Sequence, residues 1–145
     1  LQESCRNINY VLLIGKVMKS KSIDLGENMD GDAYKVIKEF WHNQDSGDYT
    51  TTKHLFAEDA LFVDPIYGTF HGREEIGAFL LKMNRAVTSI NGVFRAEKIS
   101  GNETTAWAQW SFTSDHGYRE GVGVYEVANG QITYYRDYMN ESPEG

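Results

Sequence analysis

The sequence is poor in cysteine and has no grouped histidines. Cys5 is the single cysteine among 145 residues, which excludes a disulfide within the chain and a metal cluster held by thiolates. The four histidines are scattered, without the paired spacing of a metal site, so we expect no bound metal. Gly121 and Gly123 fall inside a predicted strand rather than in a phosphate-binding loop, and we interpret them as a bend or a close approach. We therefore expect a protein without a cofactor.

Positive charge is also scarce. The 14 lysines and arginines are outnumbered by 21 acidic residues, which gives a formal net charge of −7 and a pI of about 5.0. Nucleic acids and anionic membrane surfaces need a basic face, so we expect neither as a partner. No apolar run reaches the roughly 18 residues of a membrane span. The run at residues 10–15 is too short, and no convincing signal-peptide cleavage site follows it, so we expect a cytoplasmic protein.

Aromatic residues, in contrast, are plentiful at 13% of the chain, and they can fill a core, line a pocket or do both. The length of 145 residues fits one domain with a substantial core, which we place at residues 30–145. Residues 1–29 carry no motif. We expect them to form an N-terminal extension, either a helix packed on the domain or on a partner subunit, or an added segment.

The spacing of apolar residues predicts helices first and strands afterwards, with Asp30 or Asp32 as the N-cap of the first helix. The expected helices are 33–44, 49–56 and 73–86, and the expected strands are 60–64, 89–99, 104–113, 117–127 and 131–139, with a loop or short strand at 68–72. Short turns between the last four strands imply antiparallel hairpins. The pattern predicts an α+β domain in which helices cover one face of a bent sheet.

Asp64 ends the first expected strand, after the apolar residues 61–63 and before Pro65. A carboxylate beside apolar surface is costly to bury unless it is paired, and its pKa tends to rise. Asp64 is therefore a candidate acid or base. The alternative is a turn residue that hydrogen-bonds its own backbone where the strand ends.

Two segments resemble proteins of a known superfamily. Residues 55–65, Leu-Phe-Ala-Glu-Asp-Ala-Leu-Phe-Val-Asp-Pro, with Gly-Arg-Glu-Glu-Ile at 72–76, are similar to the matching segment of bacterial ketosteroid isomerases. The Arg-Asp-Tyr triplet at 136–138 resembles limonene-epoxide hydrolase. With the order of elements over residues 30–140, these segments resemble the NTF2-like (SnoaL-like) superfamily. The resemblance implies a cone-shaped α+β barrel, with three helices packed on a strongly bent, mixed but mostly antiparallel sheet.

The resemblance also implies roles for two carboxylates. In ketosteroid isomerases the Asp before the Pro, here Asp64, is the general base. In the epoxide hydrolases the Asp of the triplet, here Asp137, helps to deprotonate the attacking water, and SnoaL-type cyclases use an Asp near it as acid or base. The sequence departs from both enzymes. Phe40 stands where the isomerase has its oxyanion-binding Tyr, Gly123 lies near the place of its second Asp, and strand 106–110 lacks the Arg and Asp of the epoxide hydrolases.

Strand alternation puts Phe62 with Asp64, and Tyr135 with Asp137, on faces that by the resemblance line the cone. Two carboxylates in such a place share a proton, so that one pKa rises and the other falls. We predict Asp64 and Asp137 as catalytic residues, with Tyr135 and His71 as further candidates; for His71 a solvent-facing or capping role is the alternative. The predicted walls of the ligand pocket are Phe40, Trp41, Phe62, Tyr67, Phe79, Trp110, Val122 and Val124.

Trp107, Tyr134 and Tyr138 are expected on the outer face of the sheet, away from the helices. Rings gathered on an exposed sheet face predict an association surface. Because relatives commonly dimerise through this face, we expect a homodimer.

These residues favour a cofactor-free acid/base enzyme of isomerase, hydrolase or cyclase type that acts on a small apolar molecule with a ring. Asp64 would be the principal base and Asp137 its acid or water-holding partner. The alternative is a binding module of the same fold, in which the carboxylates anchor a ligand or stabilise the fold. The missing oxyanion donors favour this alternative.

Overall fold

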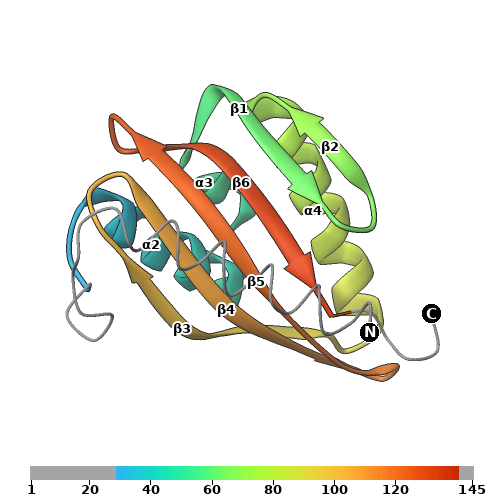
Figure 1. Cartoon of the computed structure of the whole chain (residues 1–145). Coiled ribbons are helices and arrows are strands. Elements are labelled where there is room, and N and C mark those ends of the chain that lie inside the picture. Colours follow the sequence, from blue (N-terminus) through green and yellow to red (C-terminus); the bar gives the residue numbers. More distant parts are fainter. Residues whose placement is uncertain (1–28, 141–145) are drawn as a thin grey trace, which may run out of the picture.

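The computed structural model describes residues 29–140, so the extension expected at residues 1–29 lies, except for Met29, outside the described residues. The helices are α2 (Asp32–Ser46), α3 (Tyr49–Lys53) and α4 (Arg73–Ser89). The strands are β1 (Phe56–Asp64), β2 (Gly68–His71), β3 (Val93–Gly101), β4 (Thr105–Ser114), β5 (Gly117–Ala128) and β6 (Gln131–Met139). The α+β class predicted from the sequence is confirmed (Figure 1).

The strands form one mixed sheet in the order β2-β1-β6-β5-β4-β3, and the helices lie on one of its faces (Figure 1). β1 runs parallel to β6, and the other neighbouring strands are antiparallel. Within the described residues the sheet does not close, because β2 and β3 are its edges. The parallel pairing brings the carboxyl ends of β1 and β6, with Asp64 and Asp137, to the same end of the sheet.

A stack of three aromatic rings forms the centre of the core between the helices and the sheet. Phe62 of β1, Tyr135 of β6 and Tyr125 of β5 are register partners on adjacent strands. Each neighbouring pair of rings has centroids 4.4 Å apart and an interplanar angle of 17°. Phe40 of α2 packs edge-on against Tyr135 with a centroid distance of 5.6 Å. The stack fixes the position of Tyr135, which lies two residues before Asp137 on the same face.

β1 begins at Phe56 rather than at residue 60, and α3 ends at Lys53 rather than at residue 56. Phe56 is fully buried and pairs with Ile132 of β6. Its carbonyl oxygen accepts a hydrogen bond from Arg73 Nε at 2.8 Å. These long-range contacts override the helical pattern of the local sequence, and a shift of register before Leu61 accommodates the polar residues of this part of the strand.

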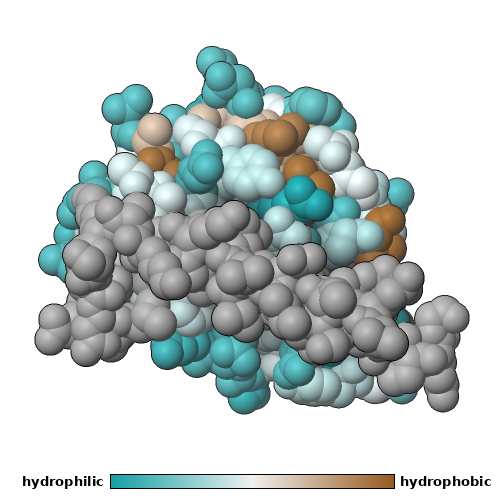
Figure 2. Space-filling view, in the orientation of Figure 1, coloured by the Kyte–Doolittle hydropathy of each residue, from teal (hydrophilic) through white to brown (hydrophobic). Residues whose placement is uncertain are grey.

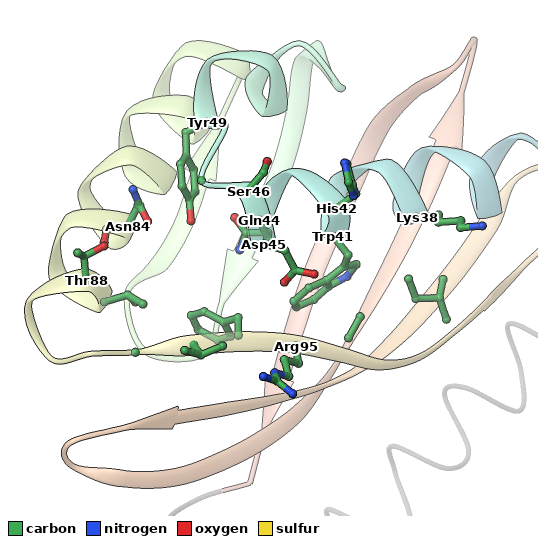
Figure 3. A pocket seen from close by; sticks show the side chains of 17 residues that line it. Lys38, Trp41, His42, Gln44, Asp45, Ser46, Tyr49, Asn84, Thr88 and Arg95 are labelled. Atoms are coloured by element: carbon green, nitrogen blue, oxygen red, sulfur yellow. The ribbon is translucent and has the colours of Figure 1, made fainter.

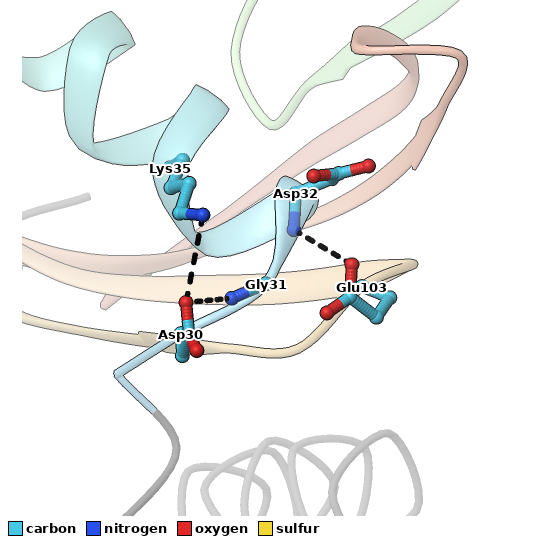
Figure 4. Close-up of polar contacts among 5 residues, drawn as sticks. All are labelled: Asp30, Gly31, Asp32, Lys35 and Glu103. Atoms are coloured by element: carbon cyan, nitrogen blue, oxygen red, sulfur yellow. Dashed lines mark hydrogen bonds and ion pairs between the residues drawn. The ribbon is translucent and has the colours of Figure 1, made fainter.

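The N-terminus of α2 is capped by the β3–β4 turn rather than by the side chain of Asp30 or Asp32. The N-cap residue is Gly31, and the backbone N–H of Asp32 donates to Glu103 Oε2 at 3.1 Å (Figure 4). Gly31 has a φ of 102°, and a Cβ there would lie 2.4 Å from the carbonyl carbon of Asn102. A glycine is therefore required where α2 meets the turn.

The outer face of the sheet carries a second apolar cluster, made of Trp107, Val122, Val124, Tyr134 and Tyr138. The prediction that Trp107, Tyr134 and Tyr138 share this face is confirmed. These rings are less exposed than predicted: Trp107 is buried with Lys98 Nζ 5.6 Å from its ring centroid, and Arg136 lies 4.9 Å from that of Tyr138. On the coloured part of the face that it draws, Figure 2 shows hydrophobic residues in separate groups among hydrophilic ones. The homodimer stays a prediction.

Candidate active site

The carboxyl group of Asp137 lies on the side of β6 that faces the helices. Its Oδ2 accepts a hydrogen bond from the hydroxyl of Tyr135 at 2.6 Å, and its Oδ1 accepts one from Trp110 Nε1 at 3.1 Å. Trp110 belongs to β4, so its indole reaches Asp137 across β5. Donors from two strands therefore hold both oxygens and fix the orientation of the carboxyl.

Burial is the strongest influence on this group and raises the pKa of Asp137 from 3.8 to about 7. The hydrogen bond from Tyr135 opposes it and lowers the pKa, the charge of Asp64 raises the pKa further, and the hydrogen bond from Trp110 lowers it. A carboxyl group with a pKa near 7 is present in both protonation states at neutral pH. It can therefore accept a proton and give it back.

Asp64 lies at the end of β1, one residue beyond the pairing of Val63 with Arg136, and is thus level with Asp137. Its Oδ1 accepts hydrogen bonds from the backbone N–H groups of Ile66 and Tyr67, both at 2.8 Å. This is the turn that the sequence offered as the alternative to catalysis. Asp64 therefore shapes the β1–β2 turn and also places a charge near Asp137.

We expect an Asp64→Asn variant to have a lower pKa at Asp137, because the neighbouring charge that raises it is removed. The amide oxygen of Asn can still accept from the two backbone N–H groups. An Asp64→Ala variant should lower the same pKa and also lose roughly 1–2 kcal/mol of stability, because the turn loses its acceptor. NMR titration of Asp137 and thermal unfolding of both variants measure the two effects separately. A rise of the pKa in both variants would contradict the assignment.

Two glycines of β5 make room for the polar groups around Asp137. Gly123 pairs with Asp137, and a Cβ there would lie 2.6 Å from the hydroxyl oxygen of Tyr125 and 3.0 Å from Asp137 Oδ1. Gly121 pairs with Trp110, and a Cβ there would lie 2.4 Å from the indole Cζ2. The close approach predicted for these glycines is confirmed, and what approaches them includes the side chains of the site.

Tyr125 connects this group of residues to helix α2. Its hydroxyl oxygen accepts a hydrogen bond from Trp41 Nε1 at 3.1 Å, and its ring stacks on that of Tyr135 with a centroid distance of 4.4 Å. Burial raises the pKa of both tyrosines well above 10, and the charge of Asp137 raises it further. Both hydroxyl groups therefore keep their protons in the neutral range, and that of Tyr135 donates its proton to the hydrogen bond with Asp137.

A pocket of about 930 Å³ opens between the C-terminal half of α2, the last turns of α4 and strand β3 (Figure 3). Trp41, Phe94 and Tyr49 give it aromatic walls, and polar side chains such as Asp45 and Asn84 also line it. Among the described residues its lining includes neither Asp64 nor Asp137. Phe94 packs edge-on against Trp110 with a centroid distance of 5.6 Å, so these two rings separate the pocket from Asp137.

Most of the predicted pocket walls lie in the core around the carboxyl group rather than in this pocket. Trp41 alone of them lines it in the described part of the chain. Tyr67 is 56% exposed but contacts Phe79, which stacks on Phe70 next to Phe62. Of the other predicted pocket walls, Phe40, Phe62 and Trp110 are buried in the hydrophobic core.

Three of the residues predicted for the site do not lie on the side of the sheet that carries Asp137. Val122 and Val124 belong to the outer cluster with Trp107, because Gly121, Gly123 and Tyr125 occupy the inner face of β5. His71 is exposed, and it follows Phe70, which stacks on Phe79 of α4 at 4.1 Å. Neighbours on a strand point to opposite faces, so His71 points away from Asp137.

Tyr125 and Phe94 are the residues of the site that the sequence did not single out. The alternation of Gly121, Gly123 and Tyr125 was the available signal, because two glycines on one face leave space for a long side chain. No comparable signal marks Phe94. Among residues 29–140 no group of His, Cys, Asp and Glu is arranged to hold a metal ion, and no helix of that part is long and apolar enough to cross a membrane.

Residues 37–135 match the family model of the SnoaL-like domain. The chain belongs to the SnoaL-like domain family. The NTF2-like, SnoaL-like superfamily inferred from the sequence is thus confirmed. No curated protein matches the chain.

Solved structures share the fold of this SnoaL-like protein. A putative ketosteroid isomerase from Kribbella flavida is 16% identical with a TM-score of 0.67, over 79% of this chain and 82% of that one. An LEH-like epoxide hydrolase from M. tuberculosis is 17% identical with a TM-score of 0.61, over 75% and 83%. A putative polyketide cyclase from Xanthomonas campestris is 19% identical with a TM-score of 0.60, over 75% and 90%. At these identities the likeness concerns the fold alone.

Proposed function

We propose that this SnoaL-like protein is a cofactor-free acid/base enzyme of isomerase, hydrolase or cyclase type. Its substrate is a small, largely apolar molecule that contains a ring. The observation that carries the proposal is the Asp137 carboxyl, held by two donors among aromatic side chains with its pKa raised to about 7. The names of the solved relatives, an isomerase, an epoxide hydrolase and a cyclase, support the same range of reactions.

In this proposal Asp137 is the principal acid/base group, and Asp64 has the supporting role. The ionised carboxyl takes a proton from the substrate, at a carbon next to a carbonyl group, or from a water molecule that attacks the substrate. The protonated carboxyl then returns that proton to the product, so the enzyme ends as it began. Tyr135 and Trp110 keep the carboxyl oriented throughout, and Asp64 keeps its proton affinity high.

The pocket is the proposed route by which a substrate reaches this group. A flat ring can stack on Trp41 and Phe94, and the polar side chains of the pocket can bind its oxygen atoms. Because Phe94 and Trp110 separate the pocket from Asp137, a movement of Phe94, which is only partly buried, has to accompany binding.

The experiment is a comparison of three reactions in wild-type protein and in an Asp137→Asn variant. The probes are a β,γ-unsaturated ketosteroid for isomerisation, a cyclic terpene epoxide for hydrolysis, and a polyketide-type β-ketoester for cyclisation. We expect wild-type protein to convert at least one of them and the variant to stay at the uncatalysed rate. Asp59→Asn, an exposed position on β1, is the matched control and should keep wild-type turnover. Equal turnover in wild type and Asp137→Asn would contradict the proposal.

A non-catalytic binding module is the second candidate, because neither carboxylate lines the pocket among the described residues. In that case the same three probes would quench the fluorescence of Trp41 with equal affinity in wild type and in Asp137→Asn. None of them would be converted. Binding together with conversion in the wild type rejects this candidate.

A further inference from the structure

Phe94 lies at the boundary between the pocket and the core around Asp137. It lines the pocket from β3, and its ring packs edge-on against that of Trp110 with a centroid distance of 5.6 Å. Trp110 in turn donates from Nε1 to Asp137 Oδ1 at 3.1 Å. A molecule that moves from the pocket to the carboxyl group therefore has to pass these two rings.

Of the two rings, Trp110 is the one that is held firmly. Its side chain is 5% exposed, and its indole N–H is bonded to the carboxyl group of Asp137. The space beside it on β5 is already filled, because a Cβ at Gly121 would lie 2.4 Å from its Cζ2. A movement of Trp110 would leave its N–H unpaired and would remove one of the two donors that orient the carboxyl group.

Phe94 has none of these constraints. It is only partly buried and carries no polar side-chain atom that needs a partner. Its strand, β3, is an edge of the sheet, and the pairing of β3 with β4 shifts register after Ala96. Phe112 stacks on one side of the ring with a centroid distance of 4.4 Å, and the pocket of about 930 Å³ gives the ring room to turn. Phe94 is therefore the ring that moves when the passage opens.

The contacts with Trp110 and Phe112 keep the ring of Phe94 in the closed position. An aromatic pair of this kind adds a modest attraction, and two pairs together favour the closed position by roughly 5-fold to 150-fold. The open position is then a minor population, roughly 1–15% of the molecules. A ligand that fits only the open position can select it.

We propose that Phe94 is the specificity-determining residue of this site: its ring closes the passage between the pocket and Asp137, and the size of the side chain at position 94 sets the size of the ring system that reaches the carboxyl group. A single-ring molecule passes after a small turn of Phe94, whereas a fused multi-ring molecule needs the ring to be displaced completely. The meaning of the passage for catalysis rests on the proposed function. The passage itself does not, and its first test needs no substrate.

The first test is hydrogen exchange of the indole N–H groups, followed by NMR in D₂O. The signals of Trp41 and Trp110 are assigned by their absence from Trp41→Phe and Trp110→Phe. In Phe94→Ala we expect the N–H of Trp110 to exchange at least about 10-fold faster than in the wild type, because the contacts that keep the passage closed are lost. The N–H of Trp41, which donates to Tyr125, reports any loosening of the core as a whole. The decisive quantity is therefore the acceleration at Trp110 divided by that at Trp41.

Val87→Ala is the matched control, because Val87 lines the same pocket from α4 and its truncation enlarges the pocket without removing the ring of Phe94. Its ratio should equal that of the wild type. Phe94→Leu keeps an apolar side chain of intermediate size, and its ratio should lie between those of the wild type and Phe94→Ala. This variant decides the question if Phe94→Ala does not fold. Equal acceleration at Trp110 and Trp41 in the folded Phe94 variants overturns the proposal.

The second test compares two probes of the proposed function, the four-ring ketosteroid and a terpene epoxide with a single ring. In Phe94→Ala the ratio of kcat/KM for the ketosteroid to kcat/KM for the epoxide should rise by about 10-fold or more, because the larger molecule gains most from the wider passage. A ratio that stays the same or falls overturns the assignment of specificity to Phe94. If no probe is converted by the wild type or by the variant, the proposed function fails, whereas a raised exchange ratio at Trp110 still establishes the passage.

Discussion

An Asp137→Asn variant is expected to be inactive. Its free energy of unfolding is also expected to fall much less between pH 4 and pH 8 than that of the wild type. A positioned acid or base contributes typically about 100-fold to 10,000-fold to the rate, and Asn can neither accept nor return the proton. On stability the pH-dependent part of the effect is favourable: at neutral pH the variant avoids the cost of a buried carboxyl group that ionises on unfolding. It follows from the pKa of Asp137, which is 3.8 as an ordinary value and about 7 in the folded protein.

The sign of the pH effect comes from the proton held by each state. Below pH 3.8 the carboxyl is protonated in both states, and its contribution to stability is complete. Between pH 3.8 and pH 7 the unfolded chain releases the proton while the folded protein keeps it, so the free energy of unfolding falls. A difference of about three pKa units corresponds to roughly 4 kcal/mol, which is lost in full above pH 7. Asn has no proton to release and shows none of this loss.

Urea unfolding of both proteins at pH 4, 6 and 8 measures the effect. Placed toward Trp110, the side-chain NH₂ of Asn would meet a second donor; placed toward Tyr135, it removes the acceptor of that hydroxyl, which must then turn to accept from the amide. Either arrangement lowers the stability of the variant by a similar amount at each pH. The informative quantity is therefore the change with pH rather than the stability at one pH. We expect the wild type to lose roughly 4 kcal/mol more than the variant between pH 4 and pH 8. Two parallel curves would mean that Asp137 ionises normally in the folded protein.

Local sequence patterns predicted the elements well where turn residues mark the ends of a strand. β6 has the predicted bounds, 131–139, because the turn residues 128–130 come directly before it. The start of β1 was wrong, because the pairing of Phe56 with Ile132 joins residues far apart in the sequence. The position of Asp137 on the inner face also followed from alternation once Tyr135 was placed inside. Which of Asp64 and Asp137 is the better candidate for the principal acid/base group could not be predicted from the sequence. That choice depends on the turn in which Asp64 accepts from the backbone N–H groups of Ile66 and Tyr67.

The inner face of β5 was assigned to its valines because a sequence pattern counts side chains, and glycine has none. Val122 and Val124 look like the apolar positions of the strand, whereas the inner positions are the empty Gly121 and Gly123. The space there is filled from other strands, by Trp110 and by the hydroxyl of Tyr125. Such an arrangement is set by the register between strands, which the order of residues in one strand does not contain.

A Gly121→Ala variant tests that arrangement, and we expect it to lose at least about 3 kcal/mol of stability. The added Cβ would lie 2.2 Å from the backbone oxygen of Tyr138 and 2.4 Å from Cζ2 of Trp110. The backbone oxygen can move only if β5 and β6 separate. The indole can move only by withdrawing Nε1 from Asp137, which removes a hydrogen bond that lowers the pKa of the carboxyl. The titration midpoint of Asp137 should therefore rise in whatever fraction of the variant stays folded.

Gly77→Ala separates this effect from the general cost of adding a methyl group to a buried glycine. Gly77 is buried in α4, and a Cβ there would lie 3.0 Å from Cβ and 3.1 Å from Cδ of Lys53. Cδ can turn away, whereas the contact with Cβ needs a shift of a few tenths of an ångström in the short helix α3. Ala is about 1 kcal/mol better than Gly in a helix and offsets part of this strain, so the net change should be below about 1 kcal/mol. Equal losses in Gly121→Ala and Gly77→Ala, with an unchanged Asp137 midpoint, would mean that Trp110 does not depend on the space at Gly121. A large loss confined to Gly121→Ala, with a raised midpoint, would mean that this glycine holds the donor in place and thereby sets the proton affinity of the carboxyl.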